Sequence, residues 1–280
     1  MSDLLLEKCY RNCEAIARES SFYRGFSLLP ASKRRAFSAV YAFMRHSDDI
    51  SDDEGLREEK EIEFARWRSQ LNDALDGRIE DHPTLPALRD TVERYQIPRE
   101  YLVRVVQGTE MDLTNTRYQT FEDLRQYCYS VASVVGLICI QIFGYRGDDA
   151  RECAEACGVA FQLTNIMRDL KEDLERDRIY LPQEDLERFH YSSEDLQRQL
   201  QNECYHALMS FQDHRAGEYY AKAWPLVEMI EPDSRRAFRA IFNSYHTILT
   251  RIRNRNYDVF SGRVRLRTVD KVAILVKAFL

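Results

Sequence analysis

Four aspartates in two pairs are the residues of this sequence best placed to do chemistry. Asp48 and Asp52 lie four residues apart in YAFMRHSDDISDD, and Asp169 and Asp173 repeat that spacing in QLTNIMRDLKED. On a helix this spacing puts both carboxylates of a pair on one face, where they repel each other unless a cation lies between them. The two pairs therefore predict a metal site.

The neighbours of the two pairs indicate which metal it is. Tyr41 and Arg45 share the helical stripe of the first pair, and because Tyr41 belongs to the apolar stripe we expect this face to turn inward. Gln162 and Asn165 share the face of the second pair. Carboxylate and amide oxygens suit Mg²⁺, which completes its shell with water and phosphate oxygens. The sequence thus predicts Mg²⁺ and a phosphorylated substrate, since four aspartates and a diphosphate of about −3 nearly cancel three Mg²⁺ ions.

A structural interpretation of the acidic residues competes with the metal site. A single acidic run on a helix is more often a solvated face or a cap, and we expect Asp49, Asp53 and Glu54 to point outward in this way. A helical scaffold protein would leave all its acidic pairs on solvent faces. Two pairs, each with an apolar aromatic flank and a nearby arginine (Arg45 and Arg168), favour the metal.

Helices must position these residues. Apolar side chains recur at spacings of three and four, and runs of alternating β-branched residues bounded by turn signals are nearly absent. Seven prolines mark helix boundaries. The pattern predicts an all-α chain with helices near residues 2–19, 31–52, 56–77, 84–95, 99–113, 121–144, 149–173, 193–223, 232–256 and 268–279, and a short extended piece at 261–268. Since no linker composition appears, we expect a single domain over residues 1–280.

Composition excludes some classes of function. The net charge of −6 and a pI near 5.7 argue against a nucleic-acid partner. The seven cysteines lack metal-binding spacings and indicate reduced thiols in the cytoplasm. No signal peptide is evident at the N-terminus. The longest apolar stretch, residues 131–144, is shorter than the roughly twenty residues that cross a bilayer, so we expect a buried helix there.

The sequence resembles the squalene and phytoene synthase family, the head-to-head prenyl diphosphate synthases of the isoprenoid synthase fold. The matching segments are SSFYRGFSLLP, YAFMRHSDDISD, YCYSVASVVG, QLTNIMRDLKED, DRIYLP and YHTILTRIRNRNYDVFSGRVRL, in the family's order along essentially the whole chain. The resemblance implies a single large helical domain around a central apolar cavity. Two facing aspartate-rich helices would hold Mg²⁺ and diphosphate at the mouth of that cavity.

The resemblance also implies roles for individual residues. The metal ligands would be Asp48, Asp52, Asn165, Asp169 and Asp173, and the four aspartates would form the catalytic group together with Tyr41 and Arg45. The substrate-binding residues would be Ser21, Phe22, Tyr41, Arg45, Tyr129, Gln162, Arg168, Arg178, Tyr180, Tyr245 and Arg263. The arginines among them would contact diphosphate oxygens. Two to three Mg²⁺ ions are expected, and NADPH is not.

Within the family, GTEMDL, RYQTFEDLRQYCYSVASVVGLICIQIFGY and DLKEDLERDRIYLP look most like the bacterial presqualene diphosphate synthases of hopanoid pathways. Such an enzyme condenses two farnesyl diphosphates, releases diphosphate and stops at the cyclopropyl intermediate. The alternative is a phytoene or dehydrosqualene synthase of carotenoid biosynthesis, because these enzymes share the same motifs. The non-enzyme alternative is a helical scaffold or assembly factor.

The expected partners follow from the same resemblance. They are prenyl diphosphates, with farnesyl diphosphate first, and the downstream isoprenoid pathway enzymes. A peripheral membrane contact is compatible with the apolar segment VDKVAILVKAFL and its two lysines, although packing on the fold is the more usual role of such a helix.

Overall fold

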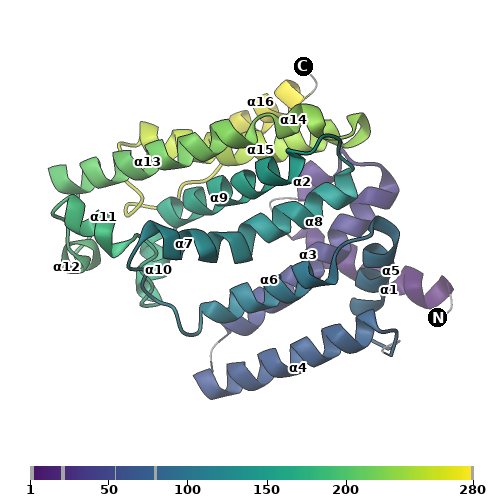
Figure 1. Cartoon of the computed structure of the whole chain (residues 1–280). Helices are drawn as coiled ribbons and strands as arrows, with labels where there is room; N and C mark the ends of the chain where they lie inside the picture. Colours follow the sequence, from purple (N-terminus) through teal and green to yellow (C-terminus); the bar gives the residue numbers. More distant parts are fainter. Residues whose placement is uncertain (1–2, 20–22, 54, 79–80, 279–280) are drawn as a thin grey trace. The chain divides into compact units, whose positions relative to one another are not determined.

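The computed structural model describes residues 3–19, 23–53, 55–78 and 81–278. Within these ranges all regular secondary structure is helical, as the sequence predicts (Figure 1). The expected extended piece at 261–268 forms no strand in this described part; residues 261–267 are irregular. Only two isolated β-bridges, Arg117 with Ile179 and Tyr145 with Ile230, occur in the same ranges.

The chain forms two compact units, each built from segments that are separate in the sequence. Unit 1 comprises Met1–Thr114, Leu137–Gly147 and Glu228–Phe238, and unit 2 comprises Asn115–Gly136, Asp148–Val227 and Arg239–Leu280. A single domain over residues 1–280, with a central apolar cavity, stays a prediction.

Unit 1 contains the first six helices, and prolines mark where some of them begin. They are α1 (Asp3–Arg18), α2 (Tyr23–Phe26), α3 (Ala31–Asp52), α4 (Arg57–Leu75), α5 (Leu85–Tyr95) and α6 (Arg99–Met111). Pro30 and Pro98 directly precede α3 and α6, where a fixed φ and a missing N–H cost nothing. Helices α1, α3 and α5 meet in a core that includes Cys13, Ala39 and Ala87, and these small side chains let the helix backbones approach closely.

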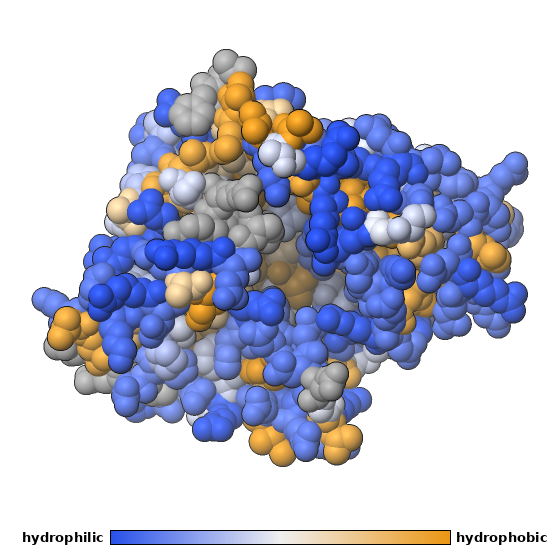
Figure 2. Space-filling model, turned by 180° about the vertical axis from the view of Figure 1, so that it is seen from behind, coloured by the Kyte–Doolittle hydropathy of each residue, from blue (hydrophilic) through white to orange (hydrophobic). Residues whose placement is uncertain are grey.

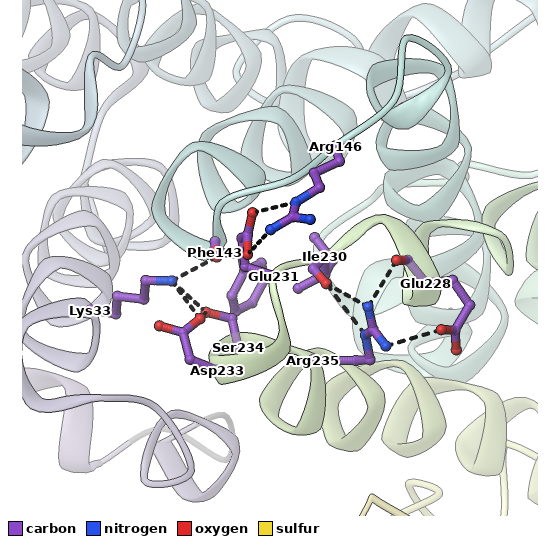
Figure 3. A network of polar contacts seen from close by, with 9 residues as sticks. All are labelled: Lys33, Phe143, Arg146, Glu228, Ile230, Glu231, Asp233, Ser234 and Arg235. Carbon is purple, nitrogen blue, oxygen red and sulfur yellow. Dashed lines mark hydrogen bonds and ion pairs between the residues drawn. The ribbon is translucent and has the colours of Figure 1, made fainter.

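A polar network in unit 1 holds the start of α3 (Figure 3). Lys33 Nζ donates to the carbonyl oxygen of Phe143, the last residue of α8 (Val134–Phe143), at 2.8 Å, and pairs with Asp233 in the first turn of α15 (Pro232–Asn254) at 2.7 Å. Arg146 donates two hydrogen bonds to the Glu231 carboxylate, at 2.9 and 3.2 Å. Because Lys33 joins three distant segments, it fixes the helix whose other end carries Asp48 and Asp52.

Unit 2 contains the remaining helical elements. They are α7 (Phe121–Cys128), a π-helical turn η1 (Tyr129–Ser133), α9 (Ala150–Arg168), α10 (Leu170–Glu175), α11 (Gln183–Arg188), α12 (Ser193–Gln197), α13 (Glu203–Ala223) and α16 (Thr268–Ala278), with parts of α8, α14 (Leu226–Met229) and α15. Helix α9 packs against α13 and η1.

Three predicted helices are interrupted, each for a local reason. The segment 121–144 contains η1, beside which Gly158 of α9 approaches so closely that an added Cβ would lie 2.4 Å from the Ser133 backbone nitrogen. The segment 149–173 breaks at Asp169, whose φ of −103° and ψ of 16° leave the α region. The segment 193–223 divides into α12 and α13, because Asn202 caps a new helix by accepting the Tyr205 N–H at 2.9 Å.

The segment Phe121–Phe143 is long and apolar enough, by length and composition, to cross a membrane. Within its most apolar window, 56% is buried inside the protein, which agrees with the buried helix expected at 131–144. All seven cysteines lie in the described part, and all are free thiols, as predicted.

Candidate functional site

The first aspartate pair lies at the C-terminal end of α3 in unit 1. The partial negative charge of a helix C-terminus repels carboxylates, and the last turn of α3 carries no basic residue. Lys60 Nζ donates to the Ser51 carbonyl oxygen at 2.8 Å and so satisfies one helix-terminal acceptor. The position is electrostatically unfavourable for Asp48 and Asp52, and such local conflicts are typical of functional sites.

Asp48 shows this conflict most clearly. The surrounding protein keeps part of the water away from the Asp48 carboxylate, and this raises its pKa most. The negative charges of Asp52 and Asp112 raise it further, to about 7, and the positive charge of Arg45 opposes the rise with a smaller effect. Water also reaches the Asp48 side chain, so the repulsion is partly screened. A divalent cation beside these carboxylates would remove the repulsion and favour the ionised form of Asp48.

Arg45 and Tyr41 lie on the same helix as predicted. Arg45 pairs with Asp49 at 2.8 Å, and both side chains are largely exposed. The prediction that Asp49 points outward fits this surface ion pair, whereas the diphosphate contact predicted for Arg45 stays a prediction. Tyr41 is half-buried, whereas Arg45, Asp48 and Asp52 are exposed. The expectation that this face turns inward is therefore wrong for the last two turns of α3, where the three charged side chains reach water.

The second aspartate pair lies around the break between α9 and α10 in unit 2. Arg168 donates from Nε to Asp169 Oδ1 at 2.8 Å, and Arg263 donates from Nε to the same oxygen at 2.9 Å. Asp173 accepts the Arg178 backbone N–H at 2.8 Å through its carbonyl oxygen. Three predicted diphosphate ligands, Arg168, Arg178 and Arg263, therefore gather near the second pair.

Two buried oxygens near Asp169 fit a hard cation. Asn165 Nδ2 donates to Gln162 Oε1 at 3.3 Å, whereas Asn165 Oδ1 is buried and accepts no hydrogen bond within the described residues. Glu172 Oε2 is buried with no hydrogen-bond partner in the same ranges, although Glu172 Oε1 lies 3.7 Å from Arg263. An orphaned buried oxygen costs free energy unless something binds it. The carboxylate and amide oxygens here are the donors that Mg²⁺ prefers.

The aspartate sets do not form a complete metal cage. Among the described residues, no group of three or more His, Cys, Asp or Glu side chains is arranged to hold a metal ion. A Mg²⁺ site of one or two carboxylates completed by water and substrate phosphates does not need such a group. The donor set therefore fits Mg²⁺ bound together with diphosphate rather than a closed structural metal.

Aromatic side chains gather near the second pair in unit 2. The Tyr180 ring stacks on Tyr127 and Tyr118 at centroid distances of 5.1 and 5.8 Å, and the Tyr127 hydroxyl donates to the Tyr180 hydroxyl at 3.4 Å. Tyr245 stacks on Phe161 at 4.0 Å. Burial raises the pKa of Tyr245 to about 12 although the Arg168 charge opposes this, so Tyr245 keeps its proton near neutral pH.

The structure places the remaining predicted residues as follows. Tyr129 begins the π-helical turn η1, a type of irregularity that is frequent at functional sites. Ser21 and Phe22 lie outside the described residues. The roles of all these residues stay predictions.

Sequence reasoning missed several residues beside the predicted ones. Asp112 follows α6 and acts on Asp48, and Glu172 lies beside Arg263, which contacts Asp169. The rings of Tyr118 and Tyr127 contact the predicted Tyr180. Asp112 occurs within GTEMDL and Glu172 within DLKED. Their place inside segments that match the family was the sequence signal that could have identified them. Their proximity to the aspartate pairs depends on packing, which spacing does not reveal.

Replacing Asp112 with Asn is expected to raise the Mg²⁺ concentration for half-maximal activity by about tenfold, because one negative charge near Asp48 is lost. The Mg²⁺ dependence of turnover measures this change. The control is Glu100→Gln, which removes one exposed charge at the other end of α6. Equal shifts in both variants would show that Asp112 acts only through net charge.

One pocket in unit 1 does not suit a prenyl chain. It has a volume of about 480 Å³ and is lined by Glu61, Arg68, Gln107, Glu110, Met111, Leu113 and Thr114. Arg68 and Glu110 form an ion pair within it, so its lining is too polar for a hydrocarbon.

Comparison with known proteins gives a consistent result. Residues 17–270 match the family model described as squalene/phytoene synthase. The 15-cis-phytoene synthase of Synechococcus elongatus is 35% identical, with 98% of this chain and 94% of that protein covered. Phytoene synthase 1 of Arabidopsis thaliana, a chloroplast protein, is 33% identical over 98% of this chain and 67% of its own length.

Solved structures show the same fold. A dehydrosqualene synthase in complex with a ligand has a TM-score of 0.90 and 29% identity, covering 98% of this chain and 96% of that one. A squalene synthase from Alicyclobacillus acidocaldarius has a TM-score of 0.86 and 26% identity, covering 92% and 98%. The isoprenoid synthase fold expected from the sequence is thereby confirmed.

Proposed function

The chain belongs to the squalene/phytoene synthase family and is a prenyltransferase, and we propose that it joins two geranylgeranyl diphosphates head to head to form phytoene, with release of diphosphate. The observation that carries this choice is the similarity to phytoene synthases at up to 35% identity along 98% of the chain. The sequence alone favoured the formation of presqualene diphosphate. The similarity to phytoene synthases supports the alternative prediction, a phytoene or dehydrosqualene synthase, better. Presqualene diphosphate formation, as in hopanoid pathways, is the second candidate, because a squalene synthase shares this fold at 26% identity.

The proposed reaction uses Mg²⁺ together with prenyl diphosphate, as expected of this family. Asp48 and Asp52 in unit 1, and Asn165, Asp169 and Asp173 in unit 2, are the proposed metal ligands. When bound, Mg²⁺ would supply positive charge to the departing diphosphate. The unpartnered buried Oδ1 of Asn165 supports its place in this set.

Arginines are proposed to bind the diphosphate directly. Arg168 and Arg263 already converge on Asp169, so their guanidinium groups are held near the proposed metal ligand before substrate arrives. Bidentate guanidinium contacts suit phosphate oxygens and stabilise the charge that develops as the allylic C–O bond breaks. Arg178, whose backbone is tied to Asp173, adds a third cation.

Tyrosines are proposed to shelter the cation that forms on the prenyl chain. The stacked rings of Tyr118, Tyr127 and Tyr180 are largely buried and present π faces, which attract a cation and exclude water. Tyr245 stays protonated and can donate a hydrogen bond to a departing oxygen. Tyr129 and Gln162 complete the proposed lining.

The proposed location is cytoplasmic, with a peripheral membrane contact and downstream isoprenoid enzymes as partners. The seven free thiols support a reducing compartment. The proposed product is a hydrocarbon that water dissolves poorly, which supports delivery to a membrane or to the next enzyme.

The first test offers the purified protein Mg²⁺ with either geranylgeranyl or farnesyl diphosphate, without NADPH, and identifies products by mass spectrometry. Phytoene from the C20 substrate is the expected result. Presqualene diphosphate from the C15 substrate would establish the second candidate instead. A C30 hydrocarbon would assign a dehydrosqualene synthase, and turnover of neither substrate would overturn the proposed reaction.

A further inference from the structure

Helix α16 is apolar on two opposite faces. Ile274 and Ala278 are buried, at 5% and 1% exposure. Val269, Val272 and Val276, spaced three and four apart, lie on the other face and are 65%, 56% and 57% exposed. A helix at a protein surface normally turns polar residues to water, so packing within this chain does not explain the outer valines.

Trp224 extends this surface. It is 52% exposed and contacts Phe242 of α15, with ring centroids 5.4 Å apart. One turn along α15 lies His246, whose pKa is lowered by burial, by Arg253 and by Lys277 of α16. Trp224 and the end of α16 therefore lie over the same stretch of α15. We call Val269, Val272, Leu275, Val276 and Trp224 the α16 patch.

The space-filling view shows this concentration of apolar side chains. In Figure 2 a group of orange side chains lies at the top of the view, where α16 is found from Figure 1, and smaller orange groups lie elsewhere among blue side chains. A contiguous exposed apolar patch in a globular protein marks an interaction site more often than isolated exposed side chains do.

The charges beside the patch are mainly basic, although the whole chain carries −6. Lys271 and Lys277 belong to α16, and within the described residues no ion pair joins either to a carboxylate. Asp270, the acidic residue of α16, forms an ion pair with Arg251 at 2.8 Å. Lys222 lies two residues before Trp224, near the Tyr219 ring. We call Lys222, Lys271 and Lys277 the basic rim of the patch, and their positive charge favours an anionic partner.

We propose that the α16 patch docks on the surface of a bilayer containing anionic phospholipid. The valines would enter the boundary between headgroups and acyl chains, Trp224 would lie at headgroup level, and the lysines would meet lipid phosphates. A second copy of this chain is the less suitable occupant, because a twofold contact would bring the same lysines together from both copies. This docking rests on the peripheral membrane contact of the proposed function and names the surface that makes it, whichever prenyl diphosphate the protein uses.

Vesicle co-sedimentation of the full chain tests the docking. Binding is expected to be stronger on vesicles of phosphatidylcholine with phosphatidylglycerol than on phosphatidylcholine alone. Replacing Val272 and Val276 with Ser should weaken binding to the mixed vesicles by at least about tenfold, because the apolar anchors are lost. Both positions are exposed, so folding should be unaffected, which circular dichroism and the Tm check. Ile62→Ser, at an exposed apolar position of α4, is the matched control.

The basic rim has its own control. Lys271→Glu with Lys277→Glu is expected to abolish the preference for anionic vesicles. Lys8→Glu with Arg66→Glu changes the net charge equally at exposed positions of α1 and α4, and should preserve the preference.

Tryptophan fluorescence reports the contact directly. The chain has two tryptophans, and the other, Trp67, is 1% exposed in unit 1. Mixed vesicles should shift the emission to shorter wavelength, and Trp224→Phe should remove this shift. Absence of co-sedimentation, or equal binding by the valine variant and wild type, would overturn the proposal. The proposal would also be overturned if the wild type bound no vesicles and sedimentation velocity showed a dimer that the valine variant disrupts.

Discussion

Replacing Asp169 with asparagine is expected to lower turnover of prenyl diphosphate by at least about a thousandfold while leaving the protein folded. Asp169 lies between two helices and accepts hydrogen bonds from both Arg168 and Arg263. The substitution removes a proposed metal ligand and the charge that holds both guanidinium groups. Steady-state release of diphosphate at saturating Mg²⁺ measures the loss.

The control for Asp169 lies on the adjoining short helix. Glu175→Gln removes an exposed carboxylate from α10, and its turnover should stay close to that of wild type. Asp48→Asn should match the loss seen for Asp169→Asn, since Asp48 is the proposed metal ligand of the first pair, in unit 1. If Asp169→Asn kept more than about a tenth of wild-type turnover, the metal assignment in unit 2 would be wrong.

Replacing Gly158 with alanine is expected to destabilise the protein by about 3 kcal/mol, at the upper end of overpacking effects. An added Cβ would lie 2.4 Å from both the nitrogen and the Cα of Ser133, and 2.6 Å from the carbonyl carbon of Ala132. Backbone atoms cannot move aside as the tip of a side chain can, so α9 and η1 must separate. Thermal and denaturant unfolding measure the change in stability.

Gly217 provides the matched control for Gly158. It lies inside helix α13, and an added Cβ would meet no heavy atom within 4 Å. Alanine is the better helix former, so Gly217→Ala should stabilise by about 0.5–1 kcal/mol. Opposite signs for the two Gly→Ala changes are the expected result. A stable Gly158→Ala protein with normal turnover would show that the close contact at η1 is not required.

The helical class of the fold and the helix that carries the first aspartate pair were predictable from sequence because they depend on local spacing. The period of α3 alone puts Asp48 and Asp52 on one face, and the predicted range of residues 31–52 matches the helix. The same reasoning put Asn165 with the second pair, and the structure leaves its Oδ1 buried without a partner. The choice of Mg²⁺ followed from oxygen donors and needed no fold.

What only the tertiary structure decided depends on contacts between residues distant in the sequence. Arg263 reaches Asp169 across 94 positions, and Asp112 acts on Asp48 from another helix. The π-helical turn exists where α9 packs closely through Gly158, so the apolar period of residues 121–144 could not reveal it. Local periodicity fixes which side chains share a face of one helix, whereas packing between helices decides which faces meet.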